Sequence, residues 1–191
     1  MLTEVQECFI NIAREIAERE LLLIVTPEPE AVREQIASSV NIDNVRFLEG
    51  ETNDTWARDH GAITMIDNGT PSLLDFTFNG WGLKFASDLD NRITRHAVEA
   101  EVLKGHYVNR LGFVFEGGSI ESDGMGVLLT TSECLLSPNR NGQLNQVEIE
   151  EYLKSTFYLQ KILWLDHGYL AGDDTDSHID TLARFCSTNT I

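Results

Sequence analysis

The amino-acid sequence predicts a single α/β domain. Segments with the 3.6-residue period of an amphipathic helix alternate with short apolar runs of strand length, in the order helix, strand, helix, strand at the start. Further along, two or three strands precede each helix, with roughly 50 residues per unit, which indicates an internal repeat. The 191 residues are 42% hydrophobic, enough to bury a core.

The first expected helix runs from about Thr3, a residue type that caps helices, to Arg19. Apolar side chains recur at helical spacing on one of its faces, namely Val5, Phe9, Ile12 and Ile16. The next expected elements are a strand, a short helix and a second strand: Leu21–Val25, Glu30–Ser38 and Val45–Leu48. Pro27 and Pro29 mark the turn after the first strand.

The middle and end of the chain are richer in strands. The turn Asp67-Asn68-Gly69 predicts a hairpin between two β-like runs. The expected strands are Gly61–Ile66, Ser72–Phe78, Leu111–Phe115, Ser119–Ser122, Val127–Thr131 and Lys161–Leu165. The expected helices are Asp88–Lys104, Val147–Phe157 and Ile179–Phe185.

The chain is strongly acidic, with 31 Asp and Glu against 14 Lys and Arg and a formal net charge of −17. Nucleic acids and anionic membranes bind basic surfaces, so neither is expected as a partner, whereas a small cationic molecule is favoured. Three widely spaced cysteines without a CxxC pair argue against a disulfide framework and a thiolate zinc site. The longest apolar run is too short to span a bilayer, and a cytoplasmic location is expected.

Two stretches concentrate polar residues where strands begin or end. Trp56 and Asp59 are three residues apart in a predicted loop, where they can offer an apolar slab and an anion to one planar cation. Glu116 is followed by two glycines, which allow close approach of a ligand or of another backbone. Each stretch also has a purely structural interpretation: a loop anchored by Trp56, and a β-bulge with a solvated Glu116.

The stretch from Asp173 to Asp180 holds four carboxylates and one imidazole in eight residues. His178 and Asp180 are two residues apart and can close around one ligand, and HxD is also a common spacing of metal ligands. A calcium loop is a weak match because the glycine and glutamate at the required offsets are missing. For Asp173 and Asp174, a solvated acidic loop is the simpler interpretation.

Five stretches, taken together and in order, resemble one family. They are Trp56-Ala-Arg-Asp-His-Gly-Ala, Phe78-Asn-Gly-Trp-Gly82, Phe115-Glu-Gly-Gly-Ser-Ile, Leu128-Leu-Thr-Thr-Ser-Glu-Cys-Leu-Leu-Ser-Pro-Asn-Arg140 and Asp173-Asp-Thr-Asp-Ser-His-Ile-Asp180. The sequence resembles the agmatine deiminases, also labelled bacterial (Porphyromonas-type) peptidylarginine deiminases, from about Leu21 to Ile191. The resemblance implies a pentein fold, an α/β propeller of five ββαβ-type units, of which about three are present here.

The resemblance also implies a reaction and its residues. The family hydrolyses agmatine to N-carbamoylputrescine and ammonia through a covalent amidino-thioether on a cysteine. By resemblance, Asp59 and Asp180 bind the guanidinium group and Trp56 lines the slot. His178 acts as general acid and then as general base, and Asp180 belongs to the same catalytic set. Glu116 either holds the guanidinium or orients the imidazole. No cofactor is implied, and a homodimer is left open.

The resemblance places the nucleophile in a C-terminal Gly-Gly-Gly-Asn-x-His-Cys-type motif, which the 191 residues do not contain. The chain is therefore expected to be truncated at both ends, to bind guanidines weakly and to turn nothing over. Cys134 is expected to be a buried structural thiol, and Cys186 is not assigned as the nucleophile. Three alternatives stay open: a deiminase for peptidyl-arginine or another guanidino compound, a non-catalytic guanidine-binding remnant, and a metal-dependent hydrolase using the HxD pair.

Overall fold

The computed structural model describes residues 2–188 and 190–191, and of Leu2 only the backbone. The chain forms two compact units, which are described in turn. The first comprises Met1–Thr52 and Arg92–Lys104, and the second comprises Asn53–Asn91 and Gly105–Ile191. Within the described ranges, no helix combines the length and the apolar character needed to cross a membrane.

The first unit is built around two parallel strands, β1 (Leu22–Thr26) and β2 (Val45–Glu49). Helix α2 (Pro29–Ile36) and the short 3-10 turn η1 (Ile42–Asn44) connect them, and helix α1 (Leu2–Ala17) precedes them. The core of this unit contains five buried residues: Ala13, Ala17, Ile36, Val40 and Val45. The predicted order of helix, strand, helix, strand is confirmed.

Helix α1 differs from its prediction in two ways. Thr3 lies inside the helix rather than capping it. The small residues Ala13 and Ala17 are buried, whereas the predicted apolar face is exposed: Val5, Phe9, Ile12 and Ile16. Small side chains let a helix approach its neighbours closely, so here the alanines face the core.

The second unit begins with the three-stranded sheet β3 (Ile63–Asp67), β4 (Thr70–Thr77) and β5 (His106–Val114). β3 and β4 form the predicted hairpin, whose turn residues Asn68 and Gly69 have φ of 49° and 81°, as a tight hairpin turn requires. β4 pairs with β5 in parallel, and the intervening chain contains α4 (Gly80–Leu83) and α5 (Asp90–Glu99). Helix α3 (Ala57–His60) precedes this sheet.

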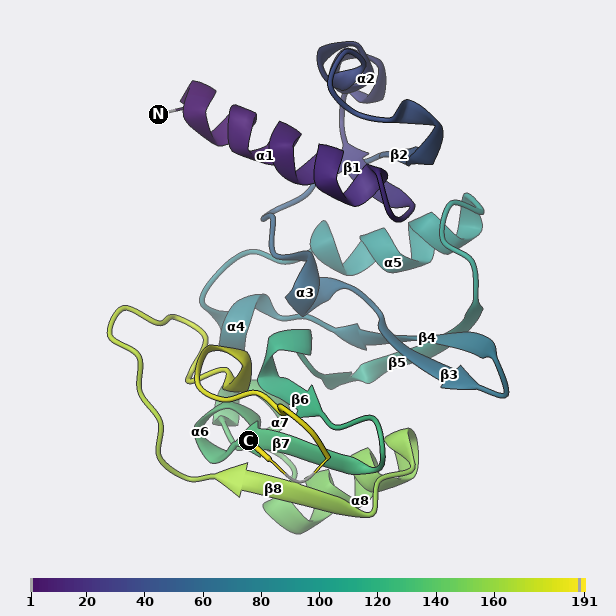
Figure 1. Ribbon diagram of the computed structural model, residues 1–191. Helices are drawn as coiled ribbons and strands as arrows, with labels where there is room; N and C mark the ends of the chain where they lie inside the picture. The colour runs from purple at the N-terminus through teal and green to yellow at the C-terminus, as the bar shows by residue number, and fades with distance from the viewer. Residues whose placement is uncertain (1, 189) are drawn as a thin grey trace. The chain divides into compact units, whose positions relative to one another are not determined.

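The next sheet repeats the same plan. β6 (Ile120–Ser122) pairs antiparallel with β7 (Val127–Thr131), and β7 pairs in parallel with β8 (Lys161–Leu165). Figure 1 shows β7 between its two partners. Three helices lie between β7 and β8 in the sequence: α6 (Ser132–Leu135), α7 (Pro138–Asn141) and α8 (Gln146–Phe157). Two successive ββαβ units confirm the predicted α/β fold of pentein-type units.

The core of the second unit joins both sheets. Phe76 and Phe113 from the first sheet, with Phe115 just after β5, pack in one apolar cluster with Leu128 of β7 and Ile149 of α8. Helix α8 starts with a capping box, in which Asn145 and Glu148 satisfy each other's backbone N–H groups. This shared core fixes the ends of β5 and β7, from which the site described below is built.

Two helices are shorter than predicted. The expected helix Asp88–Lys104 ends at Glu99, because Glu101 has a left-handed φ of 58° and the amides of Val102 and Leu103 bond back to Ala97. The expected helix Ile179–Phe185 is only the 3-10 turn η3 (Ile179–Thr181). The chain beyond it is held by Glu121, whose carboxylate accepts from the Phe185 amide and from Arg184 Nε.

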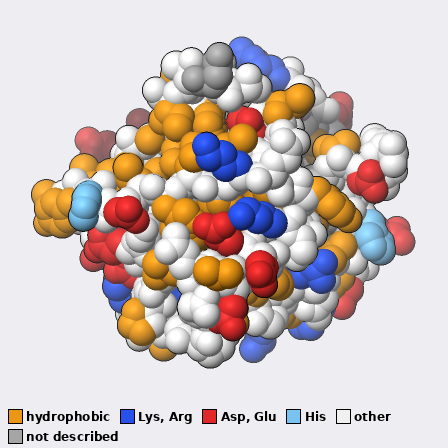
Figure 2. Space-filling view, turned by 90° about the horizontal axis from the view of Figure 1, so that it is seen from below, with side chains coloured by type: hydrophobic (Ala, Val, Ile, Leu, Met, Phe, Trp, Pro, Cys, Tyr) orange, Lys and Arg blue, Asp and Glu red, His pale blue; other side chains and the backbone are white. Residues whose placement is uncertain are grey.

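On the face shown in Figure 2, Lys and Arg side chains stand in small separate groups among acidic and apolar ones. A continuous basic stripe, which a nucleic acid would require, is not seen on this face.

Candidate functional site

The second unit contains a pocket of about 530 Å³, lined by residues from three stretches of the chain. Asp54 to Asp59 contribute one side, Trp81 and Phe85 another, and Leu170 to Thr181 the third. The pocket brings together four of the predicted site residues: Trp56, Asp59, His178 and Asp180. The fifth, Glu116, is fully buried behind His178.

Asp59 is held rigidly at the pocket wall. It lies on the short helix α3 and is only 7% exposed. Its Oδ1 accepts a hydrogen bond of 2.9 Å from the Gly118 amide, and its Oδ2 accepts one of 3.0 Å from Trp81 Nε1. Each oxygen thus keeps a lone pair free, so the carboxylate can still accept from a ligand.

Trp81 reaches Asp59 because the backbone around it is left-handed. Gly80, Trp81 and Gly82 have φ of 67°, 56° and 82°, and the Asn79 side chain closes the turn by accepting from the Gly82 amide at 2.9 Å. Such a turn is accessible to glycine without strain but costly for tryptophan. The two flanking glycines therefore make it possible to turn the indole N–H toward Asp59.

Gly118 is the point where three of the predicted site side chains meet. A Cβ atom placed there would lie 2.5 Å from His178 Nδ1, 2.7 Å from Asp59 Oδ1 and 2.8 Å from Asp180 Oδ2. No larger residue fits without moving them. The predicted close approach of another backbone occurs at the first glycine of the stretch, Gly117, where a Cβ would overlap the Arg58 carbonyl oxygen, whereas Gly118 makes room for side chains.

Asp180 lines the pocket without a hydrogen-bond partner for its carboxylate among the described residues. Burial raises the pKa of this carboxyl, and the nearby Asp59 carboxylate adds to the rise. Two carboxylates close together cost free energy when both are charged, and a shared cation would remove this cost. Asp59 and Asp180 therefore form an anionic pair that is suited to a planar cation with several N–H groups.

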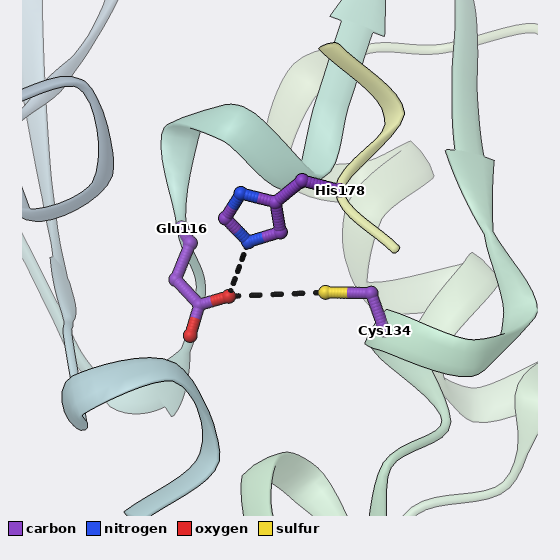
Figure 3. Close-up of side chains that lie close together, drawn as sticks. All are labelled: Glu116, Cys134 and His178. Carbon is purple, nitrogen blue, oxygen red and sulfur yellow. Dashed lines mark hydrogen bonds and ion pairs between the residues drawn. The ribbon is translucent and has the colours of Figure 1, made fainter. Parts of the chain in front are cut away.

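His178 is bracketed by carboxylates on both ring nitrogens. Its Nε2 lies 2.8 Å from Glu116 Oε2, and its Nδ1 lies 3.6 Å from Asp59 Oδ1. Figure 3 shows the imidazole pointing at one oxygen of Glu116. The ring is 2% exposed but also contributes to the pocket lining, so it can exchange a proton with a bound ligand while Glu116 fixes its orientation.

Glu116 is an anion with its own buried counter-ion. Arg140 donates from Nε to both carboxylate oxygens, at 3.1 and 3.0 Å, and its Nη2 lies 2.9 Å from Oε2. Burial alone would raise the pKa of Glu116, but the hydrogen bond from His178 and the charge of Arg140 outweigh it, and the pKa is lowered. Glu116 therefore stays ionised beside the imidazole.

Cys134 also points at Glu116, as Figure 3 shows, with its Sγ 3.8 Å from Oε2. Burial raises the pKa of this thiol well above its ordinary value, which removes it as a thiolate nucleophile. Glu116, Cys134 and His178 are spaced closely enough to hold a metal ion. However, the guanidinium of Arg140 already bonds both oxygens of Glu116, so the cluster has its cation, and of the HxD pair only His178 belongs to the cluster while Asp180 does not.

The acidic loop before His178 is held by contacts to its own carboxylates. Asp173 accepts from the Thr175 and Ser177 amides, at 3.0 and 2.8 Å. Burial would raise the pKa of Asp176, but hydrogen bonds from Lys84 and Arg140 lower it. Asp176 and Ser177 both have a left-handed φ of 62°, a strained backbone that these contacts stabilise. The crowding of carboxylates thus shapes the loop that presents His178.

Two residues of the site were not singled out from the sequence as functional: Trp81 and Arg140. A signal existed for the first, since glycines on both sides of a tryptophan indicate an unusual turn. Arg140 stands in a stretch of turn residues, and nothing local indicates that it pairs with Glu116. Trp56 lies in the pocket lining as expected, with 59% of its surface exposed. Cys8 and Cys186 are exposed, and neither lines the pocket.

Comparison with known proteins places these features in one family. Residues 1–191 match the Porphyromonas-type peptidyl-arginine deiminases. The agmatine deiminase of Stutzerimonas stutzeri is 36% identical over 188 residues, which is 94% of this chain and 49% of that protein. The agmatine deiminase of Ectopseudomonas mendocina is 37% identical over 188 residues, 95% of this chain and 49% of that protein.

Among solved structures, the fold is similar to that of a cysteine-to-serine variant of the C. jejuni agmatine deiminase with substrate bound. The TM-score is 0.87 at 42% identity, over 98% of this chain and 55% of that one. The chain spans about half the length of the curated relatives it matches.

Proposed function

Because the chain belongs to the Porphyromonas-type peptidyl-arginine deiminase family, we propose that its pocket binds a guanidino compound whose C–N bond is hydrolysed with release of ammonia. The substrate proposed is agmatine, and the products are N-carbamoylputrescine and ammonia. The observation that carries this proposal is the anionic pair of Asp59 and Asp180 beside His178. A guanidinium group offers five N–H donors in one plane and matches such a pair.

The charge of the pocket favours agmatine over a singly charged guanidine. Agmatine carries a guanidinium at one end and an ammonium at the other. Five aspartates line the pocket, against one arginine: Asp54, Asp59, Asp173, Asp174 and Asp180, with Arg58. Asp173 accepts from amides of its own loop, and Asp54 accepts from the Thr55 amide through Oδ1 alone, so Asp174 and the second oxygen of Asp54 are left for the second positive charge.

The chain's own residues then have distinct roles. Asp59 and Asp180 hold the guanidinium carbon in place for attack, and Trp56 covers the pocket with an aromatic face. Glu116 holds the imidazole of His178 from behind and does not line the pocket, which favours its orienting role over direct substrate binding. His178 transfers protons.

In the proposed reaction, a cysteine thiolate attacks the guanidinium carbon and forms a C–S bond. Protonated His178 gives its proton to the departing nitrogen, so that the C–N bond breaks and ammonia leaves. Neutral His178 then takes a proton from water, whose oxygen attacks the amidino carbon. The C–S bond breaks, the thiolate is regenerated and the ureido product is released.

None of the three cysteines suits the attacking role. Cys134 is buried with a raised pKa, and Cys8 and Cys186 do not line the pocket. The proposal therefore assigns binding and proton transfer to this chain, and assigns the thiolate to a cysteine other than these three.

Calorimetric titration of the purified chain tests the binding half of the proposal. Agmatine should bind with a measurable affinity, putrescine (which has the ammonium end but no guanidinium) more weakly, and N-acetyl-arginine amide more weakly than agmatine. Equal heats for agmatine and putrescine would contradict guanidinium recognition. Tighter binding of the arginine amide would redirect the proposal to peptidyl-arginine.

An assay of ammonia release tests the chemical half. The chain alone should release none from agmatine. Turnover that persists in the Cys186→Ser variant but disappears in Cys134→Ser would refute the exclusion of Cys134.

A further inference from the structure

The side chain of Arg140 connects Glu116 with the acidic loop before His178, although it does not itself line the pocket. It is 1% exposed, yet it makes five polar contacts. Nε and Nη2 bond the Glu116 carboxylate, Nη1 bonds Asp176 Oδ2 at 2.7 Å, and Nη2 also donates to the Thr175 carbonyl at 3.0 Å. One guanidinium thus contacts both the partner of His178 and the loop that leads to His178.

The fold places Arg140 by means of its neighbours in the stretch Ser137-Pro-Asn-Arg-Asn141. Asn141 pairs with the end of β5, accepting from the Val114 amide at 3.0 Å and donating to its carbonyl at 2.8 Å. The Asn139 carbonyl accepts from Asn79 at 2.7 Å. Since Glu116 follows Val114 by two residues, this arrangement sets the distance between Arg140 and Glu116 through the backbone.

Lys84 provides a natural comparison, because it also bonds Asp176. Its Nζ lies 2.5 Å from Asp176 Oδ1 and donates to the Asp174 carbonyl at 2.6 Å. The Lys84 side chain is 36% exposed and has no contact with Glu116. Water can replace Lys84, whereas nothing can replace a buried cation between two carboxylates.

We propose that Arg140 is a positioning residue of the deiminase site. It fixes the carboxylate of Glu116 against His178 and ties the Thr175–Asp176 segment of the pocket wall to that carboxylate. Arg140 does not touch the pocket and acts through Glu116 and the loop. This inference rests on the proposed function for its catalytic meaning, but the coupling it describes is measurable without turnover.

The test compares Arg140→Lys and Arg140→Gln with Lys84→Gln as the matched control. Agmatine affinity should fall by about tenfold or more in both Arg140 variants, as expected for loss of a bidentate contact that orders a site, and by less than about twofold in Lys84→Gln. The lysine variant keeps the positive charge but loses the planar guanidinium with its several donors, so it separates the effect of geometry from that of charge.

The second readout is the titration of the Glu116 carboxyl, followed by carbon-13 NMR. In Arg140→Gln the pKa of Glu116 should rise, because burial is no longer opposed by the arginine, while Lys84→Gln should leave it unchanged. Loss of stability alone would not move this titration. Wild-type affinity and an unmoved Glu116 titration in Arg140→Lys and Arg140→Gln would overturn the proposal.

Folding failure is also informative. If Arg140→Gln does not fold, the double variant Glu116→Gln, Arg140→Gln removes both buried charges and should fold again. Failure of the double variant while Arg140→Lys binds agmatine normally would reduce Arg140 to a residue of stability only. If the wild-type chain binds no agmatine, the proposed function fails, and the Glu116 titration still decides whether Arg140 controls this carboxylate.

Discussion

The carboxylates of the site fall into two regions that differ in how they are paired. In the pocket, the Asp59 and Asp180 carboxylates meet at Gly118 beside the His178 imidazole, and among the described residues Asp180 has no hydrogen-bond partner. Behind the pocket, Glu116 and Asp176 share the guanidinium of Arg140. The pKa of Asp180 is raised, chiefly by burial, whereas hydrogen bonds and cations outweigh burial and lower the pKa of Glu116 and of Asp176.

The acidic loop contributes to both regions, because Asp180 lines the pocket and Asp176 pairs with Arg140 behind it. The rear region already contains a guanidinium group, and it is stable because that cation is built into the chain. The front region has a similar pair of carboxylates, but no guanidinium group of the described residues bonds them as Arg140 bonds Glu116 and Asp176. A ligand guanidinium in the pocket is therefore expected to pair with Asp59 and Asp180 as the guanidinium of Arg140 pairs with Glu116 and Asp176.

Replacing Gly118 should disturb the front region most. In Gly118→Ala the new methyl group would displace His178, Asp59 and Asp180 together, and agmatine affinity should fall by about 100-fold or more, measured by calorimetry. Gly112→Ala is the matched control, because its Cβ would meet nothing within 4 Å. Wild-type binding by Gly118→Ala would mean that the three side chains do not act as one site.

Removing the charge of Asp180 should separate binding from stability. In Asp180→Asn, agmatine affinity should fall by about tenfold to 100-fold, since one anion of the pair is lost. The free protein should be as stable as the wild type or slightly more so, because a carboxyl with a raised pKa is destabilised when charged. Thermal melting with and without agmatine measures both effects, and Asp43→Asn, at an exposed position, is the control. A large loss of melting temperature in the free variant would contradict this account.

The rear region should control stability at acid pH. A carboxyl whose pKa is lowered in the folded state contributes stability that is fully present above the unfolded pKa, about 4.3 for Glu, and is lost as the pH falls through the lowered value. In urea unfolding, the free energy of unfolding of the wild type should thus fall between pH 7 and pH 3.5, and that of Glu116→Gln should fall less. Asp180 has the opposite effect: because its pKa is raised in the folded state, protonation of its carboxyl at low pH stabilises the fold. An equal pH dependence in both proteins would rule out Glu116 as a source.

The smallest effect is expected at Trp56. Its ring lines the pocket but is more than half exposed, so Trp56→Ala should weaken agmatine binding by only about two- to fivefold, in the range of an exposed cation–π contact. A calorimetric titration checks this, with Trp56→Phe as the variant that keeps an aromatic face. A loss as large as that of Asp180→Asn would place the binding energy in the indole instead of in the carboxylates.

Much of the fold could be predicted because its signals are local. Strand β8 has the predicted bounds Lys161–Leu165, and the Asp67-Asn68-Gly69 turn forms its hairpin. The position of His178 and Asp180 in one pocket could be predicted from their spacing alone. The exposed apolar face of α1 could not be foreseen, because periodicity identifies an apolar face but not what covers it.

The rest of the site depends on contacts between distant residues. Arg140 and Glu116 are 24 residues apart, and Trp81 and Asp59 are 22 residues apart. Glu116 follows β5 and Arg140 lies on α7 beyond β7, whereas Asp59 lies on α3 and Trp81 on α4, so both pairs join separate elements and no local pattern encodes them. The same holds for the helix expected at Ile179–Phe185: after the short turn η3 the chain is irregular, and the long-range contacts of Glu121 hold it.

The most direct test of the difference between the two regions is a carbon-13 NMR titration of the side-chain carboxyls with agmatine at pH 7. The resonances of Asp59 and Asp180 should shift in a saturable manner, while those of Glu116 and Asp176 stay nearly in place because Arg140 already holds them. Saturable shifts at Glu116 and Asp176 with none at Asp59 and Asp180 would show that the guanidinium does not enter the pocket, and would contradict the account.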